Sequence, residues 1–396
     1  MLSDKAKNVS PSPTLAISAK ANELKKAGVD VIGFGAGEPD FDTPDHIKKR
    51  AIDEINNGFT KYTPAAGIPE LKQAIAEKLE RDNRVSYEPE EIVVSNGAKH
   101  SLLNACTALL NPGDEALILT PYWVSYPELV KLGGGTPKII ETKEENNFKV
   151  TIEELEENIS ANTKLLILNS PSNPSGQMYS KEEIEKIGEI AIKKDIFIVS
   201  DEIYEYIVYD DNEHVSIASL SDEIKDKTVI VNGVSKSYSM TGWRIGYTAS
   251  NKELAGAMGA MQSHSTSNPA SISQMAALEA ITGPQDCVKE MVQEFDKRRK
   301  YMFQRIEDIP YLKALDPQGA FYMFISTEDT TGKRHGSQEI KNSQDFARLL
   351  LEDKKVAIVP GDGFGAEHYM RMSYATSMEN IEKGLDRIEE FIKELQ

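Results

Sequence analysis

The chain has 396 residues, more than one ordinary hydrophobic core holds, so we expect two domains. Its formal net charge of -18 argues against nucleic acid or an anionic membrane surface as a partner. No apolar run approaches the length of a membrane span and the N-terminus lacks the apolar core of a signal peptide, so we expect a cytoplasmic protein.

The middle of the chain alternates short apolar runs with amphipathic segments. The segments at 99–110 and 180–194 have a helical pattern, and the second begins with Ser180 as N-cap and Glu183 as its capping-box partner. The apolar runs are typical of strands buried on both faces, as in a parallel sheet covered by helices; they lie at residues 91–95, 115–119, 164–168, 195–199 and 228–231. The alternation predicts a doubly wound α/β core, with ligands at the carboxyl ends of its strands.

The C-terminal part has a different pattern and predicts a smaller α+β unit. We expect a large domain at residues 45–285 and a small domain formed by residues 1–44, with an N-terminal arm, and 286–396. The segment 326–343 is rich in Thr, Glu, Gly and Lys and predicts an exposed loop. The other predicted elements of the small domain are helices at 288–306 and 380–395 and strands at 319–325, 355–359 and 370–376.

Lys236 lies among small and hydroxyl residues directly after the last apolar run, with Arg244 eight residues further on. Such neighbours can donate hydrogen bonds to a phosphate, and a guanidinium can balance its charge. A lysine nucleophile beside a phosphate site is typical of a Schiff base with pyridoxal phosphate. A solvated loop lysine is the alternative that holds for most lysines.

Asp201 follows the strand predicted at 195–199, where a desolvated carboxylate needs a cationic partner. A pyridinium nitrogen would be such a partner, and Tyr204 could reach the phenolic oxygen of the same ring. A metal ligand or a helix N-cap is the alternative, but no phosphate loop supports a metal-nucleotide site. The two cysteines, Cys106 and Cys287, lack metal-ligand spacing, so we predict no metal and no disulfide framework.

Other strand ends carry residues suited to a ligand. Asn173 lies in a proline-rich turn from which its amide could bind a ligand oxygen, and the segment 95–101 runs from a strand into a helix that could bind phosphate. Trp123 could stack on a planar cofactor, although a core position is the usual role of a tryptophan. Arg371 could bind a carboxylate bidentately, or form a surface ion pair. The glycine-rich segment 33–40 lacks the third glycine of a dinucleotide-binding loop.

Seven motifs in this order resemble those of the class I aminotransferases, most closely the aspartate aminotransferase subgroup of bacteria and archaea. The resemblance runs from about residue 10 to the C-terminus. It implies the type I fold of pyridoxal-phosphate enzymes, with a mainly parallel seven-stranded sheet flanked by helices in the large domain and a small α+β domain. The motifs lie at residues 36–41, 62–67, 121–126, 172–176, 200–204, 235–246 and 371–376.

The resemblance implies a role for each catalytic and cofactor-binding residue. Lys236 would hold pyridoxal phosphate covalently and then move a proton between the substrate α-carbon and the cofactor. Asp201 would pair with the ring nitrogen, while Tyr204 and Asn173 would donate hydrogen bonds to the ring oxygen. Trp123 would stack on the ring. The implied phosphate ligands are Arg244, Ser235 and the backbone around Gly97, Ala98 and Lys99.

The resemblance also implies how substrate and subunits bind. Arg371 and the backbone of Gly37 would hold the substrate α-carboxylate, with Trp123 and Asn173 beside it. Lys99 would recognise the distal carboxylate of aspartate or glutamate. Tyr62 would reach the phosphate of a neighbouring subunit, so a homodimer with shared active sites is expected.

The implied reaction moves an amino group between L-aspartate and 2-oxoglutarate, giving oxaloacetate and L-glutamate, through a ping-pong cycle of pyridoxal and pyridoxamine forms. The alternatives on the same fold are an aminotransferase for aromatic or aliphatic amino acids and a related pyridoxal-phosphate lyase. Ser10 stands where relatives that also accept prephenate tend to carry lysine, which argues against a prephenate activity. The acidic charge and the short segment before Gly33 argue against a DNA-binding regulator.

Overall fold

A computed structural model describes residues 2–10 and 13–396. Its larger sheet has seven strands in the order β2-β8-β7-β6-β5-β3-β4, and β8 alone runs antiparallel to its neighbours. The prediction of a mainly parallel seven-stranded sheet is therefore confirmed. The strands are β2 (Ile92–Ser95), β3 (Glu115–Leu119), β4 (Thr136–Ile140), β5 (Thr163–Asn169), β6 (Phe197–Asp201), β7 (Thr228–Gly233) and β8 (Gly246–Ala249).

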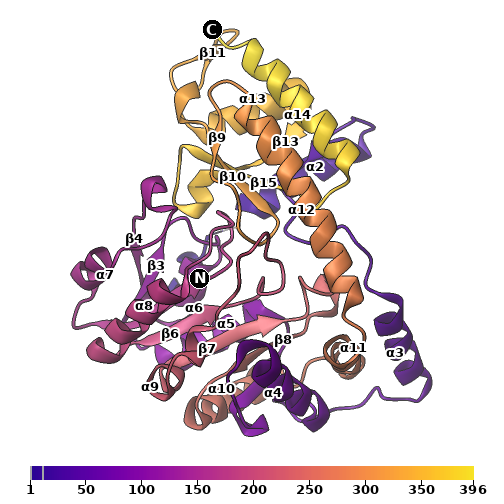
Figure 1. The fold of residues 1–396 in the computed structure, drawn as a ribbon, viewed down its shortest axis with the longest axis vertical. Helices are drawn as coiled ribbons and strands as arrows, with labels where there is room; N and C mark the ends of the chain where they lie inside the picture. Colours follow the sequence, from indigo (N-terminus) through magenta and orange to yellow (C-terminus); the bar gives the residue numbers. More distant parts are fainter. Residues whose placement is uncertain (1, 11–12) are drawn as a thin grey trace.

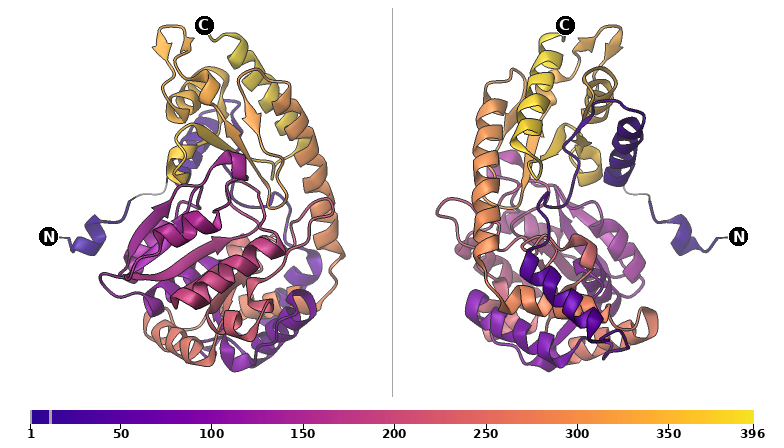
Figure 2. Two further views of the ribbon diagram at one scale, coloured as in Figure 1. Left: turned by 60° about the vertical axis from the view of Figure 1, so that its left-hand side comes forward. Right: turned by 90° about the vertical axis from the view of Figure 1, so that its right-hand side faces the viewer.

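Helices cover both faces of this sheet (Figures 1 and 2). Successive strand residues point to opposite faces, so Ile118 packs in one hydrophobic cluster with Leu102 of α5, whereas Leu117 packs in another with Ile184 of α8. This two-sided burial explains why the strands read as continuous apolar runs. The flanking helices are α3 (Asp45–Asn56), α4 (Pro69–Asn83), α5 (Ala98–Leu109), α6 (Tyr126–Gly133), α7 (Ile152–Asn158), α8 (Lys181–Lys194), α9 (Asp222–Asp226), α10 (Lys252–Ser265) and α11 (Ser271–Thr282).

The N-terminus of α8 has the predicted capping box. The hydroxyl oxygen of Ser180 accepts a hydrogen bond from the amide of Glu183 at 3.3 Å, and the amide of Ser180 donates to the Glu183 carboxylate at 2.7 Å. Two of the amides that the first turn of a helix leaves without intrahelical partners are thereby satisfied.

The smaller part contains a four-stranded antiparallel sheet in the order β14-β15-β10-β9. It packs against α12, which extends from the smaller part down to the larger one (Figures 1 and 2). The predicted large domain, residues 45–285, begins with the first residue of α3 and ends directly before the first residue of α12. The elements are β9 (Lys313–Ala314), β10 (Tyr322–Ser326), β14 (Val359–Pro360), β15 (Tyr369–Ser373), α12 (Asp286–Glu307), α13 (Ser343–Lys354) and α14 (Met378–Lys393).

The N-terminal segment joins the smaller part through the pairing of two strands that lie far apart in the sequence. β1 (Ile32–Gly33) runs parallel to β13 (Val356–Ala357), and the amide of Phe34 donates to the carbonyl of Ala357 at 2.8 Å. The single strand expected at 355–359 is therefore two short strands, β13 and β14, which belong to different sheets. The helices α1 (Asp4–Lys7) and α2 (Pro13–Lys26) precede β1.

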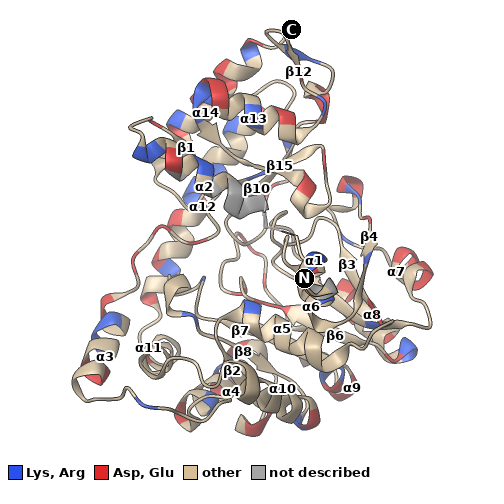
Figure 3. Ribbon diagram, turned by 180° about the vertical axis from the view of Figure 1, so that it is seen from behind, with Lys and Arg blue, Asp and Glu red and all other residues tan. Residues whose placement is uncertain are grey.

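The loop expected at 326–343 contains a short hairpin of β11 (Arg334–His335) and β12 (Gln338–Glu339). Acidic and basic residues are interspersed over both parts of the molecule (Figure 3). Across residues 2–10 and 13–396, no helix has both the length and the apolar character that crossing a membrane requires.

Candidate active site

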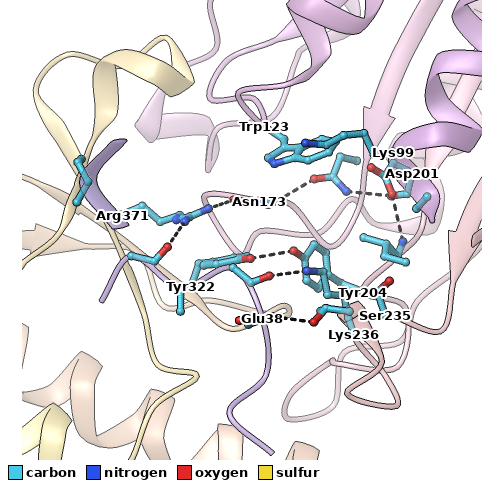
Figure 4. Close-up of a pocket in the computed structure, with 18 of the residues that line it drawn as sticks. Glu38, Lys99, Trp123, Asn173, Asp201, Tyr204, Ser235, Lys236, Tyr322 and Arg371 are labelled. Atoms are coloured by element: carbon cyan, nitrogen blue, oxygen red, sulfur yellow. Dashed lines mark hydrogen bonds between the residues drawn. The ribbon is translucent and has the colours of Figure 1, made fainter. Parts of the chain in front are cut away.

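A cavity of about 630 Å³ lies where the larger sheet faces the smaller one. Asn169 ends β5, Asp201 ends β6, and Lys236 follows β7. These three strands are neighbours and run parallel, so their carboxyl ends meet at one edge of the sheet. Tyr322 of β10 and Arg371 of β15 reach the same cavity from the smaller sheet (Figure 4). The volume suits a small organic ligand.

The Lys236 amine points into the cavity, and its Nζ donates a hydrogen bond to the carbonyl of Gly37 at 2.5 Å. Burial lowers its pKa to about 8, and the guanidinium groups of Arg371 and Arg244 act in the same direction. The carboxylates of Glu38 and Asp201 oppose this shift. The result is a lysine with a sizeable neutral, nucleophilic fraction near neutral pH.

The Asp201 carboxylate is buried and receives its hydrogen bonds from neutral donors. The Tyr126 hydroxyl donates to Oδ2 at 2.7 Å, and the amide of Ile203 lies 3.3 Å from Oδ1. Burial raises the pKa of Asp201 to about 6, although both hydrogen bonds lower it. A buried carboxylate of this kind gains from a cation brought by a ligand.

The third region of the cavity is formed by Arg244 and the start of α5. An ideal Cβ on Gly97, which has a φ of +86°, would lie only 2.2 Å from Nη2 of Arg244. A Cβ on Gly246 would lie 2.2 Å from the amide nitrogen of Ala98. These glycines therefore let the guanidinium and the first amides of α5 come together. Helix-start amides beside a guanidinium form an anion site, and Ser235 also lines the cavity.

Arg371 is buried at the opposite side of the cavity. Its Nη1 donates to Oδ1 of Asn173 at 2.9 Å and its Nη2 to the carbonyl of Gly35 at 3.2 Å. Its Nε is buried and has no hydrogen-bond partner among the residues that the structure describes. The backbone N–H of Asn173 donates to Oδ1 of Asn169 at 2.8 Å, which fixes the position of Asn173. A buried guanidinium that keeps an unsatisfied donor is suited to a carboxylate ligand.

Trp123 and Lys99 also line the cavity. The Lys99 ammonium lies 4.8 Å from the centre of the Trp123 ring. Burial lowers the pKa of Lys99, and the positive charge of Arg244 lowers it further. The Trp123 ring packs edge-on against Tyr126 with centroids 5.5 Å apart. This region therefore offers both a flat aromatic surface and a cation.

The structure brings most of the predicted site residues together. Two of them do not line the cavity of their own chain. Gly97 packs against the Arg244 guanidinium, and Tyr62 is 91% exposed. The predicted residues that line the cavity are Gly37, Ala98, Lys99, Trp123, Asn173, Asp201, Tyr204, Ser235, Lys236, Arg244 and Arg371.

Several residues of the cavity had no role assigned from the sequence. Tyr126 is part of a motif, and its position next to a strand end could have suggested a ligand contact. Glu38 accepts a hydrogen bond from the hydroxyl of Thr241 at 2.7 Å, a contact that no local pattern indicates. Tyr322 lay in a predicted strand and resembled a core residue.

Comparison with known proteins decides the family. A model of the family described as aminotransferase class I and II matches residues 29–388. The chain belongs to this aminotransferase family. The aminotransferase is 51% identical to the aspartate aminotransferase of Bacillus sp. (strain YM-2) over 99% of both chains. It is also 50% identical to a probable aspartate/prephenate aminotransferase of Rickettsia conorii, over 99% of this chain and 98% of the relative.

A solved structure shows the same fold. The aspartate aminotransferase of Rhizobium meliloti superposes with a TM-score of 0.97 at 44% identity, over the full length of both chains. Aminotransferases of this type use pyridoxal phosphate. The residues of the cavity fit that group, because Lys236 could bind its aldehyde, Asp201 its ring nitrogen, and Arg244 with the start of α5 its phosphate.

Proposed function

We propose that this aminotransferase binds pyridoxal phosphate at Lys236 and moves an amino group between L-aspartate and 2-oxoglutarate. One observation carries the proposal: the lysine of lowered pKa and the buried Asp201 carboxylate share one cavity with Arg371. Those groups suit an aldehyde, a ring nitrogen and a substrate carboxylate. The names of the relatives in Bacillus and Rhizobium support aspartate as the amino donor.

When bound, pyridoxal phosphate supplies an aldehyde for the amino group and a ring that accepts the electron pair left at the α-carbon. Lys236 Nζ would accept the proton from the substrate α-carbon and deliver it to the cofactor, a role that its lowered pKa favours. Asp201 keeps the ring nitrogen protonated by its negative charge. Tyr204 and Asn173, which line the cavity, would donate hydrogen bonds to the ring oxygen, and Trp123 would offer its ring for stacking.

The substrate is held by positive charge at two places. Arg371 takes the α-carboxylate with the help of the Gly37 backbone, and its buried, unpartnered Nε provides a donor. Lys99 takes the distal carboxylate from its position over the Trp123 ring. Two cations at opposite sides of the cavity favour a dicarboxylic substrate over an aromatic or aliphatic one.

The Rickettsia relative carries prephenate as well as aspartate in its name. In this chain Ser10 is exposed, and its amide donates to the Glu128 carboxylate at 3.0 Å. A serine cannot supply the positive charge of the lysine that the family resemblance implies at this position in relatives accepting prephenate. We therefore propose aspartate and 2-oxoglutarate, without prephenate, as the substrates.

We also propose a cytoplasmic homodimer with shared active sites. The exposed side chains of Ile52, Ile55 and Tyr62 lie on and just after α3 and support a subunit contact there. Tyr62 would then reach the phosphate of the partner. Mixing Lys236→Ala chains with Tyr62→Phe chains tests this, because hybrid dimers should regain one intact site. Activity of the mixture equal to the average of the two parents would contradict shared sites.

A single-turnover experiment tests the proposed reaction. Purified enzyme mixed with aspartate alone should change the absorbance of its bound cofactor and release one oxaloacetate per site. Lys236→Ala should abolish this change, while the matched control Lys289→Ala, an exposed lysine on α12, should leave it intact. Lys99→Ala should weaken the reaction with aspartate far more than that with an aromatic donor. Full turnover in Lys236→Ala would refute the proposal.

A further inference from the structure

Phe364 packs against the Arg371 guanidinium, the group proposed to hold the substrate α-carboxylate. The Cζ atom of Arg371 lies 5.1 Å from the centre of the Phe364 ring and 4.4 Å from the centre of the Tyr322 ring (Figure 4). Both rings are buried. The face of an aromatic ring carries partial negative charge and attracts a cation within about 6 Å of its centre. Two aromatic rings therefore stabilise this guanidinium.

The hydrogen bonds of the Arg371 guanidinium go to neutral groups. Its Nη1 donates to Oδ1 of Asn173, and its Nη2 donates to the carbonyl of Gly35. Burial lowers the pKa of Arg371, and the groups that oppose this effect are the phenols of Tyr322 and Tyr204 rather than a carboxylate. A buried cation whose partners are all neutral is costly. The aromatic contacts reduce this cost until a substrate carboxylate supplies the negative charge.

The position of Phe364 is fixed by a contact with the larger part of the molecule. Phe364 ends the short 3-10 helix η6 (Gly361–Phe364), which follows β14. Its carbonyl accepts a hydrogen bond from the amide of Tyr122 at 3.1 Å. Tyr122 precedes Trp123, which lines the cavity. The ring that supports Arg371 is thus attached to the segment that carries Trp123 to the cavity.

We propose that Phe364 is a positioning residue: its ring face holds the Arg371 guanidinium in one orientation at the cavity, ready for the substrate α-carboxylate. This inference rests on the proposed function, because the carboxylate is that of aspartate or 2-oxoglutarate. Ordering a long side chain before binding reduces the entropy lost when the substrate binds. The carboxylate is present in the bound substrate and in the transition state alike. Loss of the ring should therefore weaken substrate binding and leave the rate of the bound complex nearly unchanged.

Phe364→Leu keeps an apolar side chain but removes the ring face. In single-turnover reactions of the holoenzyme with aspartate, the apparent Kd should rise roughly 3- to 30-fold, the range expected for a cation–π contact at a desolvated site. The maximal rate should stay within about twofold of the wild-type rate. Titration of the apoenzyme should give an unchanged affinity for pyridoxal phosphate, because Arg371 is assigned to the substrate and not to the cofactor.

Phe346→Leu is the matched control. Phe346, on α13, is also fully buried, but its ring packs edge-on against Phe391 with centroids 5.3 Å apart. The two variants remove the same atoms from buried positions in the smaller part, so comparing them separates the effect of the ring on Arg371 from the cost of a cavity. Phe346→Leu should react with aspartate at the wild-type apparent Kd.

Fluorinated phenylalanines at position 364 isolate the charge of the ring face, and they serve also if Phe364→Leu folds poorly. Each added fluorine withdraws negative charge from the ring face and changes the shape little. The apparent Kd for aspartate should therefore rise stepwise with the number of fluorines at position 364 and stay constant in the same series at position 346. An apparent Kd that does not change with fluorination at position 364, or that rises equally at both positions, would overturn the inference. A wild-type protein that binds pyridoxal phosphate and fails to react with aspartate would instead overturn the proposed function.

Discussion

Gly97→Ala tests whether Arg244 and the start of α5 form the phosphate site. Gly97 precedes α5 with a φ of +86° and a ψ of 159°. An added Cβ would lie 2.2 Å from Nη2 and 2.8 Å from Cζ of Arg244. Carbon and nitrogen atoms cannot approach so closely, so the guanidinium must leave its place and its hydrogen bond to the carbonyl of Thr241 at 2.7 Å. The cavity should lose this cation while Lys236 and Asp201 stay where they are.

Two effects of different size follow from this geometry. Forcing alanine into the left-handed region should lower the free energy of unfolding by about 1–3 kcal/mol. Losing the charged hydrogen bonds from Arg244 to a phosphate should cost a further 1.5–3 kcal/mol or so in binding. The second effect corresponds to a roughly 10- to 150-fold weaker affinity for pyridoxal phosphate.

Equilibrium unfolding in urea and titration of the apoenzyme with pyridoxal phosphate measure the two effects separately. Gly113→Ala is the control, because Gly113 has a φ of +101° but, apart from its chain neighbours, no atom of the described residues lies within 4 Å of its ideal Cβ. It should lose stability and keep its affinity. In an Arg244→Ala background, Gly97→Ala should weaken binding little further. Wild-type affinity in Gly97→Ala would refute the assignment of Arg244 to the phosphate site.

Three further outcomes are expected. Asp201→Asn keeps an acceptor for the Tyr126 hydroxyl but removes the charge, so pyridoxal phosphate should dissociate at least tenfold more readily in equilibrium dialysis. The rate at which the apoenzyme captures pyridoxal phosphate should rise with pH with a midpoint of about 8, because the neutral amine of Lys236 is the nucleophile. At pH 7.5 about a quarter of the Lys236 amines are neutral, against about a thousandth for an ordinary lysine. A midpoint near 10 would show that burial does not lower the pKa of Lys236 and would contradict this prediction. Ser180→Ala should destabilise the fold by about 1 kcal/mol in urea and leave turnover unchanged.

The sequence predicted the central strands well because burial on both faces makes them continuous apolar runs. β4 and β8 escaped prediction for physical reasons. β4 lies at the edge of the sheet and is mostly half-buried or exposed, so its pattern is weak, and β8 has only four residues and begins with Gly246. The split of 355–359 into β13 and β14 depends on two different partners, β1 and β15, which no local pattern specifies.

Candidate site residues could be predicted from the sequence where their chemistry shows in a local pattern. Lys236 and Asp201 each follow an apolar, strand-like run, and Lys236 lies among small and hydroxyl residues. These local patterns were sufficient to mark both as candidate site residues. Tyr322 lies 118 positions from its hydrogen-bond partner Tyr204, and Glu38 lies 203 positions from Thr241. Such contacts form only when distant parts of the chain pack together. In the sequence alone, Tyr322 resembles an ordinary core aromatic residue and Glu38 an ordinary loop carboxylate.

The pairing of β1 with β13 has a consequence for how the protein is made. β1 holds the segment that carries Gly35 and Gly37 to the cavity, yet its partner strand begins only at Val356 of 396 residues. At about 5–20 residues per second, the ribosome needs tens of seconds to supply that partner. The larger sheet, complete by Ala249, can form during this interval, whereas the side of the cavity that carries Gly35 and Gly37 must wait. A nascent chain stalled before β13 should therefore bind pyridoxal phosphate weakly, if at all, and no substrate.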